Sequence, residues 1–217
     1  MANILAGRAP GNDLDETGRT QAQALVERLV DVPLVSVVSS PLERCVQTIE
    51  PLVAARSDLE LQLDEGLLEC DYGEWTGQGL AGLSKTPLWK VVQAQPSAVR
   101  FPAGEAMLDM QHRAVTAVRR HDAAVDATHG SAALWVAVSH GDVIKAIVAD
   151  ALGMHLDSFQ RIAVDTASVS VIRYAPLRSF VLHVNDRGSL THLRPPPRTR
   201  RRRAPASSDA VVGGGAR

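Results

Sequence analysis

Cysteine is scarce in this sequence, and long apolar runs are missing from it. Its 217 residues contain two cysteines, Cys45 and Cys70, which form neither a disulfide framework nor a Cys-x-x-Cys motif. No stretch approaches the roughly 18 consecutive apolar residues of a membrane span. The first residues, Met1 to Arg8, show no basic start followed by an apolar core, so no signal peptide is predicted. These absences predict a protein of the cytoplasm.

The motifs of metal and nucleotide chemistry are also missing. The sequence has no His-Glu-x-x-His, no carboxylate loop of the calcium-binding kind and no clustered His/Cys set. We therefore expect no metal and no cofactor. It has no Gly-x-x-x-x-Gly-Lys loop either, which argues against a nucleotide triphosphatase.

Composition predicts one globular domain with a tail. Apolar residues make up 45% and charged residues 22%, as in ordinary soluble proteins. From Pro195 onward the chain is rich in Pro, Arg and Gly, with six arginines and one aspartate, and it cannot offset its ordering entropy. We expect a domain over residues 1–194 and a disordered tail over 195–217. Nucleic-acid binding by this tail is the alternative, disfavoured because no aromatic residues lie between the arginines.

Apolar periodicity predicts strands that alternate with helices along the domain. This order is typical of an α/β fold with a largely parallel sheet and helices on both faces, and such sheets bind ligands beyond the carboxyl ends of their strands. The expected strands are 34–38, 59–63, 134–138, 168–172 and 180–184; the expected helices are 17–30, one that starts at Pro41 with Ser40 as its N-cap, 105–127 and one that ends at Leu152.

Two of these strands end in residues suited to an anion. Ser139-His140-Gly141-Asp142 lies between a buried strand and a helix, where free N–H groups and the helix dipole favour phosphate. Arg44 follows the strand 34–38 on the first helical turn, and its guanidinium suits a phosphate dianion. Arg44 taken alone is more often a surface residue; a second polar residue at an equivalent strand end favours the functional interpretation.

Glu69 is a candidate proton donor. A carboxyl group flanked by apolar residues can keep its proton near neutral pH and deliver it to a leaving alkoxide. The alternative is a solvated loop acid. Spacing alone does not distinguish Glu69 from its acidic neighbours, which are Asp64, Glu65, Asp71 and Glu74.

Taken in order, these segments resemble the histidine phosphatase (phosphoglycerate mutase-like) superfamily, and within it an actinobacterial branch of probable phosphomutases and phosphatases. The resemblance covers about residues 3–185 and implies a three-layer α/β/α sandwich. The segments that carry it are Ser39 to Thr48, Glu69 with Tyr72 to Gly77, Ser139 to Asp142 and, more weakly, Leu14 to Ala22 and Phe101 to Glu105.

The resemblance also implies roles in phosphoryl transfer. Arg44 would bind the transferring group, His140 would hydrogen-bond to it, and Glu69 would protonate the leaving group and then activate water. No metal is required, and the expected partner is a small phosphorylated substrate. Family variation implies that Trp75, Trp89 and residues 78–100 shape a cover over the pocket, although Trp89 is equally well read as core packing. The implied substrate-binding residues are Arg44, Asn3, Gly141 and Glu105.

One feature of the family is missing. Its nucleophile is a histidine in an Arg-His-Gly motif at the end of the first strand, and no Arg-His-Gly occurs here. His129-Gly130 reads as the end of a helix instead. If Asn3 is the family's asparagine, the chain begins inside the first active-site motif. We then expect no phosphatase turnover, and poor folding because a central strand is missing, with the edges of strands 34–38 and 134–138 left unpaired.

Three functions therefore stay open. The first is a phosphatase or phosphomutase acting on a small phosphorylated metabolite, inactive without the missing motif. The second is a pseudoenzyme that binds a phosphorylated ligand or a protein partner. The third is nucleic-acid association through the arginine-rich tail.

Overall fold

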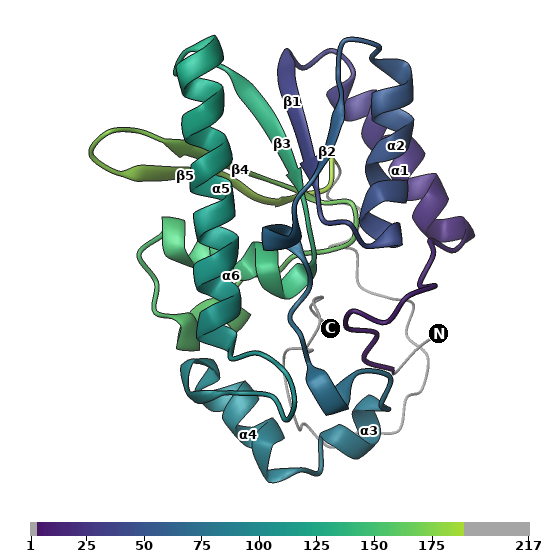
Figure 1. Cartoon of the computed structure of the whole chain (residues 1–217), viewed down its shortest axis with the longest axis vertical. Coiled ribbons are helices and arrows are strands. Elements are labelled where there is room, and N and C mark those ends of the chain that lie inside the picture. Colours follow the sequence, from purple (N-terminus) through teal and green to yellow (C-terminus); the bar gives the residue numbers. More distant parts are fainter. Residues whose placement is uncertain (1–3, 189–217) are drawn as a thin grey trace, which may run out of the picture.

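The computed structural model describes residues 4–188 and contains a parallel sheet, an antiparallel hairpin and six α-helices (Figure 1). Asn3 and the tail 195–217 lie outside the described residues. No helix in residues 4–188 is long and apolar enough to cross a membrane. The strands are β1 (Leu34–Ser39), β2 (Leu61–Leu63), β3 (Leu134–Val138), β4 (Val169–Tyr174) and β5 (Ser179–Asp186). The helices are α1 (Glu16–Leu29), α2 (Glu43–Ala55), α3 (Leu80–Leu83), α4 (Pro87–Ala94), α5 (Met107–His129) and α6 (Gly141–Ala151), with short 3-10 turns η1 (Glu65–Leu67), η2 (Gly73–Trp75), η3 (Pro96–Ala98) and η4 (Leu156–Arg161).

The parallel sheet has the strand order β2-β1-β3, and helices cover both of its sides. Helices α1 and α2 lie on one side of the strands and α5 and α6 on the other, which confirms the expected α/β sandwich (Figure 1). Ser39 at the end of β1 is in register with Leu63 of β2 and Val138 of β3. The three carboxyl ends therefore meet at one edge. The late strands β4 and β5 pair antiparallel in a separate sheet.

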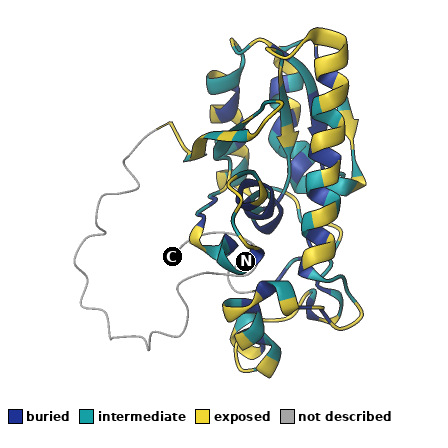
Figure 2. Cartoon of the chain, turned by 90° about the vertical axis from the view of Figure 1, so that its left-hand side faces the viewer, coloured by how far each residue is buried: buried dark blue, intermediate teal, exposed yellow. Residues whose placement is uncertain are grey.

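Helix α5 shows how apolar spacing builds the core. Its buried residues Met107, Met110, Ala114 and Ala117 recur every three or four positions and so share one face. Figure 2 shows exposed and buried residues alternating along this helix. The helix ends at His129, and Gly130 follows with φ of 86°. The interpretation of His129-Gly130 as a helix end is confirmed.

The prediction that both β1 and β3 would have unpaired edges is wrong for β1. Strand β1 pairs with β2 on one side and directly with β3 on the other. Strand β3 instead has a free second edge within residues 4–188, and Leu134 and Ala137 are exposed. The sequence indicated that these strands belong to one sheet, but apolar runs do not encode strand order.

The predicted start of α2 is also wrong. The helix begins at Glu43 with Leu42 as N-cap, so Ser40 is not its cap and Pro41 lies outside it. The helix continues through Pro51 to Ala55. Ser40 is therefore free to make a contact elsewhere.

Amide exchange tests the free edge of β3. About half of the N–H groups of β3 point away from β1 and have no strand partner within the described residues. We expect these amides to exchange at least roughly tenfold faster than those of β1, which is paired on both sides. Hydrogen–deuterium exchange followed by NMR measures this. Uniform protection of β3 at the level of β1 would show that its outer edge is covered.

Candidate functional site

The site lies where β1 and β3 end. The N–H of Ser40 donates to the carbonyl of Val138 at 2.9 Å, so the two strand exits are held side by side. His140 is the N-cap of α6 and Gly141 is its first residue, while Arg44 is the second residue of α2. These positions bring together the two residues that the sequence placed at separate strand ends: Arg44 Nη2 lies 3.0 Å from His140 Nδ1.

His140 is buried, and both of its ring nitrogens have partners. Arg44 faces Nδ1, and the Ser40 hydroxyl lies 2.8 Å from Nε2. The thiol of Cys45 is also near Nε2, at 3.5 Å. Burial, reinforced by the positive charges of Arg44, Arg113 and Arg8, holds the pKa of His140 well below its ordinary value. The imidazole is therefore neutral at physiological pH.

Arg44 has unused hydrogen-bonding capacity. Its Nη2 donates to the carbonyl of Gly7 at 2.9 Å in addition to the contact with His140. Its Nη1 is buried and has no hydrogen-bond partner among residues 4–188. A buried guanidinium nitrogen without an acceptor is costly, and an anion in the site relieves that cost.

Glu69 is the buried acid of its loop. Of the five acids that the sequence left as alternatives, it alone is buried, with 4% of its surface exposed. Its Oε1 accepts from the N–H of Cys70 at 2.9 Å. Burial, and then the negative charge of Asp142, raise the pKa of Glu69 to about 8 despite Arg44 and Arg113. This carboxyl group therefore keeps its proton at neutral pH.

Glu105 joins two arginines to the Glu69 loop. Its Oε1 accepts from Arg8 at 2.9 Å, from Arg113 at 2.6 Å and from the N–H of Asp71 at 2.8 Å, and its Oε2 accepts from Arg113 at 3.0 Å. Burial alone would raise the pKa of Glu105, but these hydrogen bonds and charges outweigh it and hold the pKa below its usual value.

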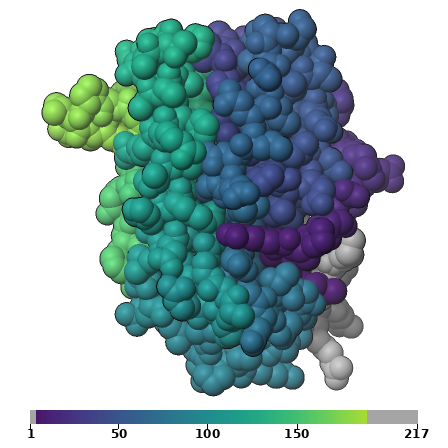
Figure 3. Space-filling view, in the orientation of Figure 1, coloured from purple at the N-terminus to yellow at the C-terminus, as the bar shows by residue number. Residues whose placement is uncertain are grey.

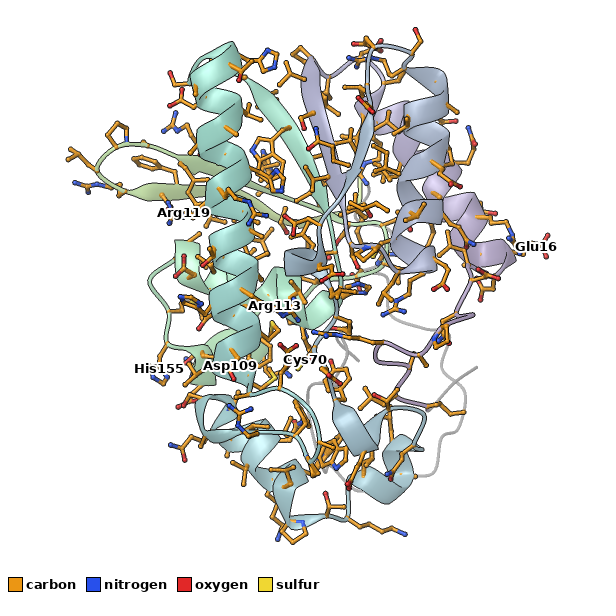
Figure 4. All side chains as sticks on the ribbon, viewed as in Figure 1. Glu16, Cys70, Asp109, Arg113, Arg119 and His155 are labelled. Carbon is orange, nitrogen blue, oxygen red and sulfur yellow. The ribbon has the colours of Figure 1, made fainter. Side chains whose placement is uncertain are left out.

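The two arginines in turn hold the backbone of Glu69. Arg8 Nε and Arg113 Nη2 donate to the Glu69 carbonyl at 2.7 and 3.0 Å. Figure 4 shows Arg113 on α5 and Cys70 in the adjoining loop, close together near the middle of the molecule. Sequence reasoning missed Arg8, Arg113 and the contact of Ser40 with His140. Ser40 belongs to the segment Ser39 to Thr48 that carries the family resemblance, so the sequence offered a signal for it. Arg113 lies at an ordinary position of a predicted helix, and the sequence offered no signal for its role.

Trp75 and Trp89, which the resemblance places in a cover over the pocket, belong to an aromatic cluster. Trp75 and Trp89 stack with ring centroids 6.1 Å apart, and Phe101 packs edge-on against Trp75 at 5.3 Å. Both tryptophans are buried, so of the two interpretations of Trp89 the packing one holds. Figure 3 shows the N-terminal segment, in purple, lying across the surface above this part of the chain.

The described part of the chain contains no group of three or more His, Cys, Asp or Glu side chains arranged to hold a metal ion. The site's cations are its arginines.

The raised pKa of Glu69 predicts a pH-dependent stability. Between the unfolded pKa of about 4.3 and the folded pKa, the unfolded chain loses a proton that the folded chain keeps, so stability falls by up to about 1.4 kcal/mol per pH unit as pH rises. We expect Glu69→Gln to remove most of the loss between pH 5 and 8. Urea unfolding at both pH values measures it, with exposed Glu60→Gln as the control. Equal losses for the wild type and Glu69→Gln would contradict the burial argument.

Comparison with known proteins identifies the family. Residues 2–187 match the histidine phosphatase superfamily (branch 1). Phosphoserine phosphatase 1 of Hydrogenobacter thermophilus is 30% identical over 175 residues, which are 80% of each chain. The probable phosphoglycerate mutase GpmB of Cronobacter sakazakii is 28% identical over 84% of each chain.

The fold agrees with a solved relative. The structure of the mycobacterial glucosyl-3-phosphoglycerate phosphatase superposes with a TM-score of 0.75 at 23% identity, covering 85% of this chain and 91% of that one. A family match over most of the chain, and a site at the carboxyl ends of parallel strands, lead to one conclusion: this chain belongs to branch 1 of the histidine phosphatase superfamily, a family of phosphatases and phosphomutases.

Proposed function

We propose that this chain binds the phosphate group of a small phosphorylated metabolite at Arg44, with His140 and Glu69 completing the site. The observation that carries the proposal is Arg44 Nη1, a buried donor without an acceptor among the described residues, on a guanidinium whose other nitrogen is fixed by His140. Phosphoryl transfer needs mainly positioning and charge stabilisation, which a fixed guanidinium supplies.

Glu69 is the proton donor in this proposal. Its pKa of about 8 keeps the carboxyl group protonated at neutral pH, so in a form that carries the Arg-His-Gly histidine it would give its proton to the alkoxide that leaves as that histidine bonds to phosphorus and the P–O bond breaks. In that form the resulting carboxylate would then take a proton from the water that displaces the histidine from phosphorus. Two arginines, Arg8 and Arg113, hold the backbone of Glu69 and so fix where the proton is delivered.

The other predicted substrate-binding residues divide into two kinds. Gly141 opens α6, and its N–H group belongs to the positive end of that helix, where a phosphate oxygen is stabilised. Glu105 acts through other residues, because Arg8, Arg113 and the N–H of Asp71 already occupy its carboxylate. Asn3 remains a sequence-based prediction.

The nucleophile is the missing part of the chemistry. The 217 residues contain no Arg-His-Gly. Cys45 is the thiol nearest to His140, but burial raises its pKa to about 12, so it stays protonated and is a poor nucleophile. We therefore propose that this 217-residue polypeptide binds phosphate without forming a covalent phosphoenzyme.

Phosphate binding is expected under both leading interpretations. The first is an enzyme whose turnover needs an Arg-His-Gly motif, and the second is a pseudoenzyme that binds a phosphorylated ligand without turnover. The names of similar proteins refer to phosphoserine, phosphoglycerate and glucosyl-3-phosphoglycerate, which supports a small phosphorylated metabolite as the ligand.

Substitution of Arg44 tests the binding site. Arg44→Gln removes a charge-assisted contact to the anion, so we expect affinity for inorganic phosphate or vanadate to fall roughly 10- to 100-fold. Isothermal titration calorimetry measures it. Arg100→Gln is the matched control, since Arg100 is exposed and pairs with Asp109. Unchanged affinity in Arg44→Gln would reject Arg44 as the phosphate ligand.

Turnover tests the nucleophile. With p-nitrophenyl phosphate, we expect the 217-residue protein to release no product above the buffer rate, because the remaining groups bind phosphate without attacking it. Hydrolysis that His140→Ala abolishes would contradict this. A form extended with a strand ending in Arg-His-Gly separates the two interpretations: it should gain turnover if the protein is an enzyme, and stay inactive if it is a pseudoenzyme.

A further inference from the structure

Ser40 makes a contact that neither its position before α2 nor the proposed chemistry explains. Its hydroxyl lies 2.8 Å from His140 Nε2, and both residues are buried. The backbone of Ser40 is fixed by its hydrogen bond to Val138, so the hydroxyl is held in place by the pairing of β1 with β3. The N–H of Leu42 also donates to this hydroxyl oxygen, at 3.4 Å.

The two contacts of the ring determine where its proton is. A guanidinium has donors only, so the Nδ1 atom that faces Arg44 at 3.0 Å must accept and must carry a lone pair. A neutral imidazole then carries its proton on Nε2, and Nε2–H donates to the Ser40 oxygen. The opposite tautomer would set an N–H of His140 against an N–H of Arg44. The sulfur of Cys45 is a weaker and more distant alternative acceptor for Nε2–H, at 3.5 Å.

We infer that Ser40 is a positioning residue that holds His140 in its neutral Nε2–H tautomer, with the Nδ1 lone pair directed at Arg44. The inference concerns the ligand-free protein and stands on hydrogen-bond geometry; only its effect on ligand affinity rests on the proposed function.

The charges around the His140 ring also favour its neutral form. Arg44 of α2, Arg113 of α5 and Arg8 of the N-terminal segment all oppose a proton on Nδ1, and burial does so more strongly. Glu69 and Asp142 are the two buried acids among the described residues; Asp142 accepts from the Tyr72 hydroxyl at 2.9 Å, and the raised pKa of Glu69 keeps it neutral near pH 7. No carboxylate charge from Glu69 is therefore present at that pH to favour an imidazolium.

Ser40 in this way acts on the phosphate ligand through two other residues. The hydroxyl fixes the ring, the ring accepts from Arg44 Nη2, and Arg44 is left with Nη1 open for an anion. Without the hydroxyl, Nε2–H loses its main acceptor in a buried place, and the ring turns or exchanges between tautomers. Arg44 then loses one of the two acceptors that orient it.

NMR of protein labelled with ¹⁵N-histidine tests the assignment. In the ligand-free wild type at pH 7, we expect His140 in a single, neutral Nε2–H state. Ser40→Ala should replace this state with a mixture of tautomers or an exchange-broadened signal, and Ser40→Thr should restore it. Ser39→Ala is the matched control, because Ser39 is equally buried but donates to the backbone carbonyl of Ser40.

A wild-type spectrum showing His140 as Nδ1–H or as imidazolium would overturn the inference, and this holds even if Ser40→Ala fails to fold. An unchanged Nε2–H signal in folded Ser40→Ala would overturn it too. Phosphate titration separates this from the proposed function. Ser40→Ala should weaken phosphate binding roughly 3- to 10-fold relative to Ser39→Ala. A wild type that binds no phosphate would refute the proposed function while the NMR result still decides the role of Ser40.

Discussion

The parallel pairing of β1 with β3 is the constraint on which the site depends. It ends with the hydrogen bond from the N–H of Ser40, the residue after β1, to the carbonyl of Val138, the last residue of β3. The two exits are thereby forced together, so Arg44 meets His140 although 96 positions separate them in the sequence. A slip of one of these strands by one residue would turn its own exit to the opposite face and separate the pair.

The groups around this junction combine the positive charge of arginines with buried side chains that stay neutral. Three arginines, Arg8, Arg44 and Arg113, surround a histidine and a glutamic acid that are both neutral near pH 7. Glu105 compensates two of the arginines and leaves Arg44 as the one with an unpartnered buried nitrogen among residues 4–188. The local field therefore favours an added anion, and the protonated Glu69 does not repel it.

Much of the fold was predictable from local pattern. The strand 134–138 and the end of α5 at His129-Gly130 agree with the structure because apolar spacing and a terminating glycine act within a few residues. The start of α2 was mispredicted, because Ser-Pro is a favourable helix start in a sequence. In the structure the Ser40 hydroxyl contacts His140, and the helix begins at Glu43. The unpaired edge expected for β1 was also wrong, since strand order is set by packing over long range.

For the site, the sequence by itself determined which chemical groups are available: a guanidinium and an imidazole after two buried strands, an acid among apolar neighbours, and no Arg-His-Gly. Only the tertiary structure decided their states. Burial selected Glu69 among five acids and raised its pKa, and strand pairing brought a guanidinium nitrogen to 3.0 Å from His140 Nδ1. Protonation depends on distance and desolvation, and both are set by segments that are far apart in the chain.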